Sequence, residues 1–225
     1  MSLLSKSKIK TKFLISPIVL IVLIIFLVPI ILQNVSKQYS TISKFSKIGL
    51  SSTQDLSILI KKVQYHHYKF DRFIRHSNLI KVAIQSGGST NVPGLDTEKK
   101  NFKSNIKTFN TLFAKYNKQY NLTQQHPNTT AKVLENLELY SANIDSVFNQ
   151  VTKDYQAVLN AHIKLNQTYN TLEKEIENLI GDIRIKTQTA IINVQKGAKD
   201  HINLFMIYLG AAALITLGIG LFFST

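Results

Sequence analysis

Apolar residues recur along most of the chain at spacings of three and four, which is the period of an amphipathic helix. One such stripe runs from Ile42 to Ile84, a second from Phe102 to Tyr120, and a third from Leu134 to Val194. The same alternation of three and four characterises coiled-coil seams. No stretch alternates with a period of two, so the pattern predicts an all-α fold.

Two uncharged apolar runs stand near the ends of the chain, from Phe13 to Leu32 and from Leu204 to Phe223. Each is long enough for a helix to cross the ~30 Å hydrocarbon core at ~1.5 Å per residue. A cleaved signal peptide is the alternative for the first run, but no small-residue cleavage site follows it. We therefore predict transmembrane helices at residues 13–32 and 202–223.

Two segments rich in glycine, proline and asparagine interrupt the stripes, at residues 86–94 and 124–128. A turn near residues 149–154 would divide the remaining residues, 129–200, into a short and a long helix. The lengths then match those of the earlier helices and predict an up-down helical bundle with long first and last helices. Because no glycine or proline marks that turn, a long antiparallel helical hairpin is the alternative.

The charge distribution predicts how the chain crosses the membrane. Four lysines precede the first apolar run, which places a basic tail, residues 1–12, in the cytoplasm. Residues 33–201 then form an extracytoplasmic helical domain, and residues 224–225 return to the cytoplasm. The chain carries a formal net charge of +14, but an extracytoplasmic position argues against nucleic acid as a partner. The basic surface favours anionic small molecules or acidic partners instead.

This layout of basic start, span, helical domain and second span resembles the sensing half of bacterial methyl-accepting chemotaxis proteins. Residues 63–87, with the run Tyr-Lys-Phe-Asp-Arg-Phe-Ile-Arg at 68–75, look like the first helix of four-helix-bundle and helical-bimodular sensor domains. The resemblance implies a homodimer in the bacterial cytoplasmic membrane, with a chemotaxis or two-component output. Its ligand would be a small anion or a periplasmic binding protein.

The chain departs from these receptors at its end, since they continue past the second span into a HAMP linker and a signalling module. Here the sequence stops at Thr225. We therefore expect either a fragment of a longer receptor or a protein that signals through a cytoplasmic partner.

A basic cluster flanks the second half of the first stripe and is the candidate ligand contact: Lys69, Arg72, Arg75 and His76. The guanidinium group is a planar fork suited to a carboxylate or another oxyanion. In aspartate-type chemoreceptors, which this chain resembles, arginines on the first helix hold the ligand at the dimer interface. The alternative interpretation is a solvated basic face.

Two histidines, His66 and His162, fall on stripe positions whose neighbours are apolar. In the predicted bundle their heights differ by only ~9 Å, so they are candidates for a shared polar layer that binds a ligand or senses pH. Separate, hydrogen-bonded core histidines are the alternative. His67 and Asp71 stand one turn apart, with Arg75 continuing the line. This pattern is more typical of a surface ion pair than of a metal site.

Nothing in the sequence predicts an enzyme, a metal site or a cofactor. There is no phosphate-binding glycine loop, nucleophile elbow or zinc-binding HExxH helix, and the absence of cysteine excludes thiolate chemistry. The leading hypothesis is a transmembrane receptor region for an anionic ligand. The second is a membrane-anchored coiled-coil tether or accessory assembly protein that needs no ligand.

Overall fold

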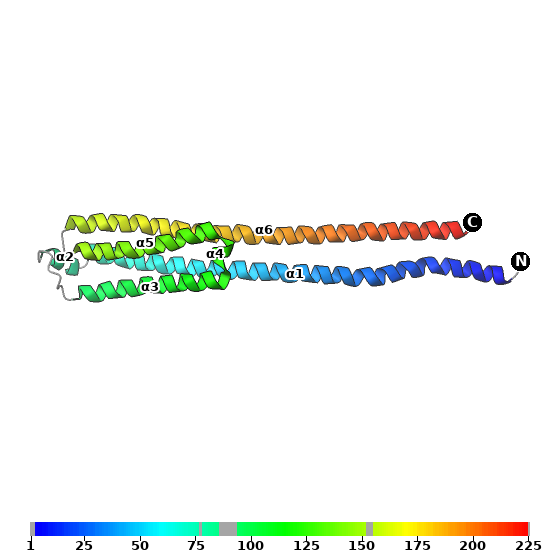
Figure 1. Cartoon of the computed structure of the whole chain (residues 1–225), viewed down its shortest axis with the longest axis horizontal. Helices are drawn as coiled ribbons and strands as arrows, with labels where there is room; N and C mark the ends of the chain where they lie inside the picture. The colour runs from blue at the N-terminus through cyan, green and yellow to red at the C-terminus, as the bar shows by residue number, and fades with distance from the viewer. Residues whose placement is uncertain (1–2, 77, 86–93, 152–154, 225) are drawn as a thin grey trace. The chain divides into compact units, whose positions relative to one another are not determined.

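A computed structural model describes residues 3–76, 78–85, 94–151 and 155–224 of the chain. Within these ranges there is no strand, which confirms the all-α fold class. The helices are α1 (Leu3–His76), α2 (Asn78–Gln85), α3 (Leu95–Tyr120), α4 (Leu122–Gln125), α5 (Pro127–Val151) and α6 (Tyr155–Ser224) (Figure 1).

Two backbone positions with positive φ bound α3. Gly94 precedes its first residue with a φ of 89°, a conformation that glycine adopts without steric cost. Asn121 follows its last residue with a φ of 54°, and its N–H bonds back to the carbonyl of Asn117. Asparagine is among the few other residues that tolerate this region, so the helix ends here. Pro127 then begins α5, at the position where a missing N–H costs nothing.

The third predicted stripe is carried by two helices, since α5 ends at Val151 and α6 begins at Tyr155. The predicted turn at residues 149–154 therefore coincides with the change of helix, although residues 152–154 lie outside the described residues. Most of the predicted loop at residues 86–94 lies outside them as well. The predicted break at 124–128 holds the short α4 and a turn at His126.

The chain divides into two compact units. Unit 1 combines residues 1–46 with residues 187–225, and unit 2 comprises residues 47–186. Helices α1 and α6 each contribute residues to both units, whereas α2 to α5 belong to unit 2.

In unit 2 the helices α1, α3, α5 and α6 lie side by side around one apolar core (Figure 1). Three aromatic rings join α1, α3 and α5. The centroid of the Phe70 ring lies 4.9 Å from that of Phe102 and 5.7 Å from that of Phe148, and both pairs pack edge to face. The predicted stripe of α3 is confirmed in full, with all of its members buried: Phe102, Ile106, Phe109, Phe113, Tyr116 and Tyr120. Burial of each such large side chain stabilises the fold by roughly 1.5–3 kcal/mol.

The predicted stripe is wrong at the start of α5. Leu134 is 41 % exposed, whereas Val133 is fully buried. Both residues fit the helical period, because Val133 lies four residues before Leu137 and Leu134 lies three residues before it. Packing selects Val133, and α5 continues its buried face through Leu137, Tyr140 and Ile144. Phe45 and Tyr155, also assigned to stripes, are exposed.

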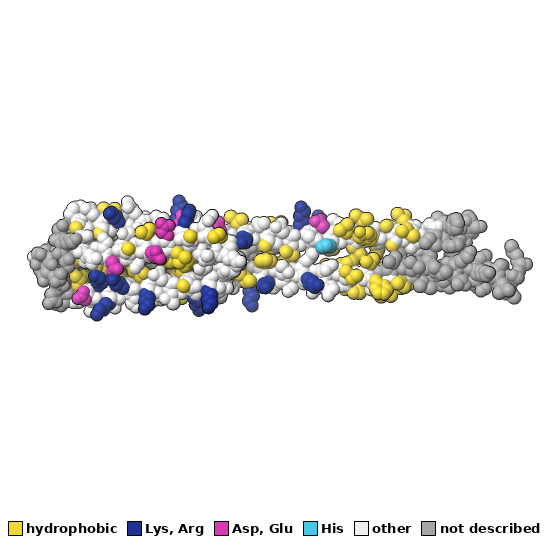
Figure 2. Space-filling model, in the orientation of Figure 1, with side chains coloured by type: hydrophobic (Ala, Val, Ile, Leu, Met, Phe, Trp, Pro, Cys, Tyr) yellow, Lys and Arg dark blue, Asp and Glu magenta, His cyan; other side chains and the backbone are white. Residues whose placement is uncertain are grey.

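Large apolar side chains lie on the surface of unit 1 (Figure 2). Among the described residues, one helical segment, Tyr155–Gly218, is long and apolar enough to cross a membrane. Its exposed side chains include Ile207, Leu214 and Leu217. In the first predicted span, Phe26 and Leu32 are exposed in the same way.

Candidate functional site

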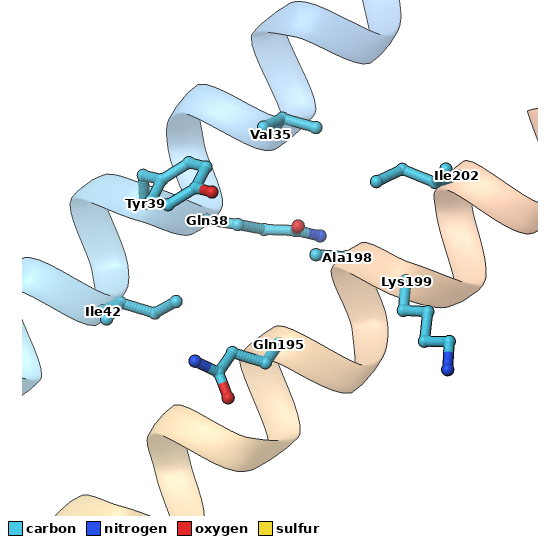
Figure 3. Close-up of a pocket in the computed structure, with 8 residues that line it drawn as sticks. All are labelled: Val35, Gln38, Tyr39, Ile42, Gln195, Ala198, Lys199 and Ile202. Carbon is cyan, nitrogen blue, oxygen red and sulfur yellow. The ribbon is translucent and has the colours of Figure 1, made fainter.

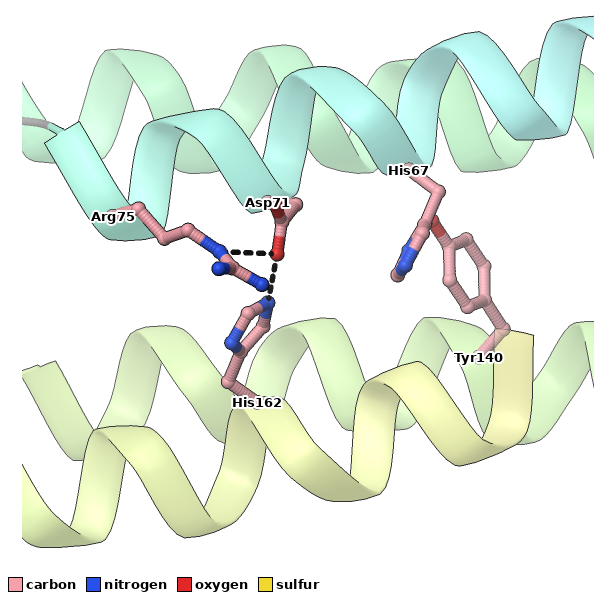
Figure 4. Close-up of polar contacts among 5 residues, drawn as sticks. All are labelled: His67, Asp71, Arg75, Tyr140 and His162. Carbon is pink, nitrogen blue, oxygen red and sulfur yellow. Dashed lines mark hydrogen bonds and ion pairs between the residues drawn. The ribbon is translucent and has the colours of Figure 1, made fainter. Parts of the chain in front are cut away.

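A cluster of polar and aromatic side chains lies within unit 2, where α1 faces α5 and α6 (Figure 4). His67, Asp71 and Arg75 follow one another at intervals of four on α1, so they share one face of the helix. Tyr140 of α5 and His162 of α6 face this line. The interior cluster is the name we give to the buried and partly buried members of this group together with their two ring neighbours: His66, His67, Asp71, Tyr140, His162 and Tyr169.

Asp71 joins α1 to α6. Its Oδ1 lies 3.0 Å from Nε of Arg75 and 3.1 Å from Nε2 of His162. His162 is buried, with 6 % of its surface exposed, whereas the Arg75 side chain is 62 % exposed. Burial lowers the pKa of His162, and the Asp71 carboxylate partly opposes this effect. The carboxylate thus stands between a buried imidazole and a solvent-facing guanidinium.

His67 is held between α5 and α6. Its ring stacks on Tyr169 with centroids 3.8 Å apart and an angle of 5° between the planes. Its Nδ1 lies 3.4 Å from the hydroxyl of Tyr140. Burial lowers the pKa of His67 to about 4, although Asp71 and a hydrogen bond with Asn166 act in the opposite direction.

His66 lies deeper, with only 3 % of its surface exposed. Its ring packs edge to face with the rings of Phe102 and Phe109, at centroid distances of 5.3 and 5.2 Å. Its Nδ1 is 3.2 Å from the hydroxyl of Tyr140. Burial lowers the pKa of His66 to about 4, and the nearby positive charge of Lys69 contributes to this lowering.

One tyrosine hydroxyl therefore serves two imidazoles, at 3.2 Å from His66 and 3.4 Å from His67. The hydroxyl has one proton, so it can donate to one Nδ1 and must accept from the other. Burial raises the pKa of Tyr140 above its ordinary value, which keeps that proton on the oxygen. This arrangement suits two neutral imidazoles in opposite tautomers.

The structure buries both histidines of the predicted polar layer but gives them different partners. His66 contacts Tyr140 of α5, whereas His162 contacts Asp71 of α1. His67, which the sequence suggested as part of a surface ion pair, lies inside the cluster instead. Tyr140 was not predicted: the third stripe was assigned Ser141 in its place, because the two neighbouring residues fit the helical period equally well. Among the described residues, no group of three His, Asp or Glu side chains could hold a metal ion.

The four residues of the predicted ligand contact all lie on the exposed surface of α1. Lys69 Nζ sits 4.6 Å above the centre of the Tyr65 ring, which is itself exposed. Arg72 and His76 also face solvent. Arg75 connects this basic surface to the interior cluster, because it contacts Asp71 through Nε. The terminal amino groups of its guanidinium are the part suited to an anion.

Unit 1 contains a cavity of about 270 Å³ between its parts of α1 and α6 (Figure 3). Val35 and Ile42 line it from α1, and Ala198 and Ile202 from α6. The side chain of Gln38 also faces this space, and its Oε1 is buried without a hydrogen-bond partner among the described residues. The cavity is mostly apolar and involves none of the predicted site residues.

Comparisons of the chain with protein-family models, with curated proteins and with solved structures find no match. The resemblance to chemotaxis receptors thus rests on the order of segments and on the first stripe alone.

Proposed function

We propose that this chain is the ligand-sensing and membrane-spanning part of a dimeric two-pass receptor. The observation that carries the proposal is the continuity of α6, a single helix from Tyr155 to Ser224. Its first part supplies core residues of unit 2, such as Leu165 and Leu172, and its last part is apolar and exposed. A continuous helix of this kind can transmit a displacement from one part of the chain to another.

The finer architecture belongs to the same proposal. The core shared by α1, α3, α5 and α6 supports an up-down four-helix bundle as the extracytoplasmic domain. The exposed apolar residues of unit 1 support two spans, at residues 13–32 and 202–223. Both chain ends would then lie on the cytoplasmic side, as the four N-terminal lysines indicate.

The ligand would be a small carboxylate or inorganic anion that binds Arg72 and Arg75. Asp71 already occupies Nε of Arg75, so an anion at this guanidinium competes with the attraction between the two side chains. Asp71 also contacts His162 of α6. A ligand that draws Arg75 away from Asp71 therefore alters a contact between the first and last helices. Shifts of ~1–2 Å between packed helices are a common form of allosteric transition.

A second copy of the chain would complete the site. Ile58, Tyr65, Tyr68 and Arg72 follow one another on α1 at spacings of seven, three and four, and all are exposed. This stripe lies opposite the buried face of the same helix and suits a coiled-coil contact between two α1 helices. The contact would bring the arginines of both copies together, and an anion would relieve their repulsion.

Thermal unfolding of the full chain in detergent micelles, against a panel of carboxylates, amino acids and inorganic anions, tests the proposal. A ligand at 100 times its Kd stabilises the native state by ~2.7 kcal/mol and raises the melting temperature. Arg72→Ala combined with Arg75→Ala should abolish the rise. The matched control is Lys107→Ala with Lys118→Ala, which removes the same charge from the exposed face of α3. An equal response of both double variants would overturn the site.

A tether or assembly protein is the second candidate, and the exposed apolar residues of α1 favour it. Ile58, Tyr65 and Tyr68 could hold two chains together without any ligand. This function predicts self-association that is independent of anions. Substitution of the three residues by serine would then disrupt the dimer, whereas the Arg72 and Arg75 double variant would leave it intact. Sedimentation in micelles distinguishes the two cases.

A further inference from the structure

We propose that the interior cluster is a second input site whose ligand is the proton, and that acidification changes the contact of α6 with α1. The cluster is separate from the anion site on the surface of α1, and Asp71 connects the two. The chemistry of proton binding follows from the side chains themselves. Only its role as a signal rests on the proposed receptor function.

The geometry favours the neutral form of the cluster. His67 lies flat against Tyr169, and its Nδ1 faces a tyrosine hydroxyl rather than a carboxylate. His66 is enclosed by Phe102 and Phe109, and its Nδ1 faces the same hydroxyl. A second proton on the ring that accepts from Tyr140 removes the acceptor nitrogen that Tyr140 uses, so it breaks a buried hydrogen bond and adds a buried charge. A second proton on the other ring adds a buried charge alone.

The surrounding charges do not compensate for that added charge. On α1, Asp71 favours protonation of His67, whereas Lys69 opposes protonation of His66. On α6, Glu173 favours the protonated form of His67, and His162 opposes it. The groups that face the two rings from α5 and α3 are uncharged: the Tyr140 hydroxyl and the Phe102 and Phe109 rings. The backbone of Phe102 also hydrogen-bonds to His66 and favours its protonated form. Burial is the largest influence on both histidines, and it opposes the charged form.

Protonation has a directional consequence because the cluster joins two long helices. His67 belongs to α1 and His162 to α6, so two charged rings repel one another across the contact between these helices. Asp71 already faces His162 at 3.1 Å, and a charged His162 competes with Arg75 for it. The stack of His67 on Tyr169 joins the same two helices, so a charge on His67 changes a second contact between α1 and α6.

The chain has no cysteine, which allows a single fluorine label to report on α6. We would introduce Asn170→Cys, at an exposed position next to Tyr169, and attach a trifluoromethyl probe. Fluorine NMR of the full chain in micelles, without added anion, should show a second environment that grows as the pH falls toward about 4, because burial lowers the pKa of His66 and His67 to about that value in the folded chain. The two environments correspond to the neutral and protonated clusters.

Variants decide whether the cluster is responsible. His67→Gln keeps a polar group but cannot take up a proton, and it should remove most of the change. His162→Gln is the second variant, and it serves if the first fails to fold by circular dichroism. His201→Gln, at an exposed position of unit 1, is the control and should leave the titration unchanged. An unchanged titration in His67→Gln and His162→Gln, or none in the native sequence, would overturn the proposal.

The anion site and the proton site can be refuted independently of each other. Anion binding is measured by thermal unfolding at about pH 8, where the histidines are neutral. The fluorine titration is measured without a ligand. Loss of an anion response with an intact acid response would overturn only the site at Arg72 and Arg75. The opposite result would overturn only the proton site.

Discussion

Acidification should destabilise the fold through His66, which is the most deeply buried histidine of the interior cluster. Its pKa is lowered from 6.5 to about 4 in the folded chain. In the unfolded chain the ring takes up a proton near its ordinary value, so the unfolded state binds more protons between these two limits. The free energy of unfolding therefore falls as the pH drops from about 6.5 to about 4. Above that window the contribution of His66 to stability is fully present.

The size of the effect follows from the shift in pKa. A difference between 6.5 and about 4 corresponds to ~3 kcal/mol, at about 1.4 kcal/mol for each pKa unit. His67 has a similar shift, but the two rings share Tyr140, so their contributions are not additive. A loss of ~3 kcal/mol is a large part of the 5–15 kcal/mol that stabilises a typical domain.

Urea unfolding of the full chain in micelles, followed by circular dichroism, measures this loss from about pH 7 to about pH 4. Carboxylates also titrate at the acidic end, so the informative quantity is the difference between the native sequence and His66→Leu. The variant should lose less stability on acidification by ~3 kcal/mol, because leucine has no proton to take up. His201→Gln is the control and should follow the native profile. An equal loss of stability on acidification in the native sequence and in His66→Leu would contradict this prediction.

Three further predictions concern the aromatic core, the contact of Asp71 with Arg75, and the turn before α3. Phe148→Ala should lower the free energy of unfolding by about 3–5 kcal/mol in urea titrations, because the ring joins α5 to the aromatic core; Leu139→Ala, at an exposed position of the same helix, should change it little. Asp71→Asn should tighten binding of an anion at Arg75, measured by thermal unfolding, because it removes the competing carboxylate; weaker binding would contradict the site. Gly94→Ala should cost about 1 kcal/mol in urea unfolding, because its φ of 89° disfavours a side chain.

The helical periodicity predicted which faces are buried but not which of two adjacent residues makes the contact. The stripe of α3 was correct because five of its six residues have polar neighbours on both sides, and Phe113, which follows Leu112, keeps the helical spacing from Phe109. At the start of α5, Val133 and Leu134 are both apolar, and only packing against the other helices selects between them. Pattern alone contains no information on that choice.

The interior cluster shows the same limit for chemistry. The apolar surroundings of His66 and His162 in the sequence were enough to predict that both are buried. Their partners depend on how α1, α5 and α6 align, since Asp71 and His162 are far apart along the chain. A shift of one residue on α5 would have replaced Tyr140 by Ser141. The contact of Asp71 with His162 therefore emerges only from the three-dimensional arrangement.

The most direct test of the account is whether a stimulus in unit 2 reaches the apolar part of α6. A trifluoromethyl label at Asn203→Cys, exposed on α6 in unit 1, reports on that part of the helix in micelles. Its fluorine resonance should change with acid, or with an anion that stabilises the fold. The change should occur over the same range of pH or anion concentration as that of a label at Asn170→Cys. A response at Asn170→Cys with none at Asn203→Cys would contradict a receptor that signals through α6.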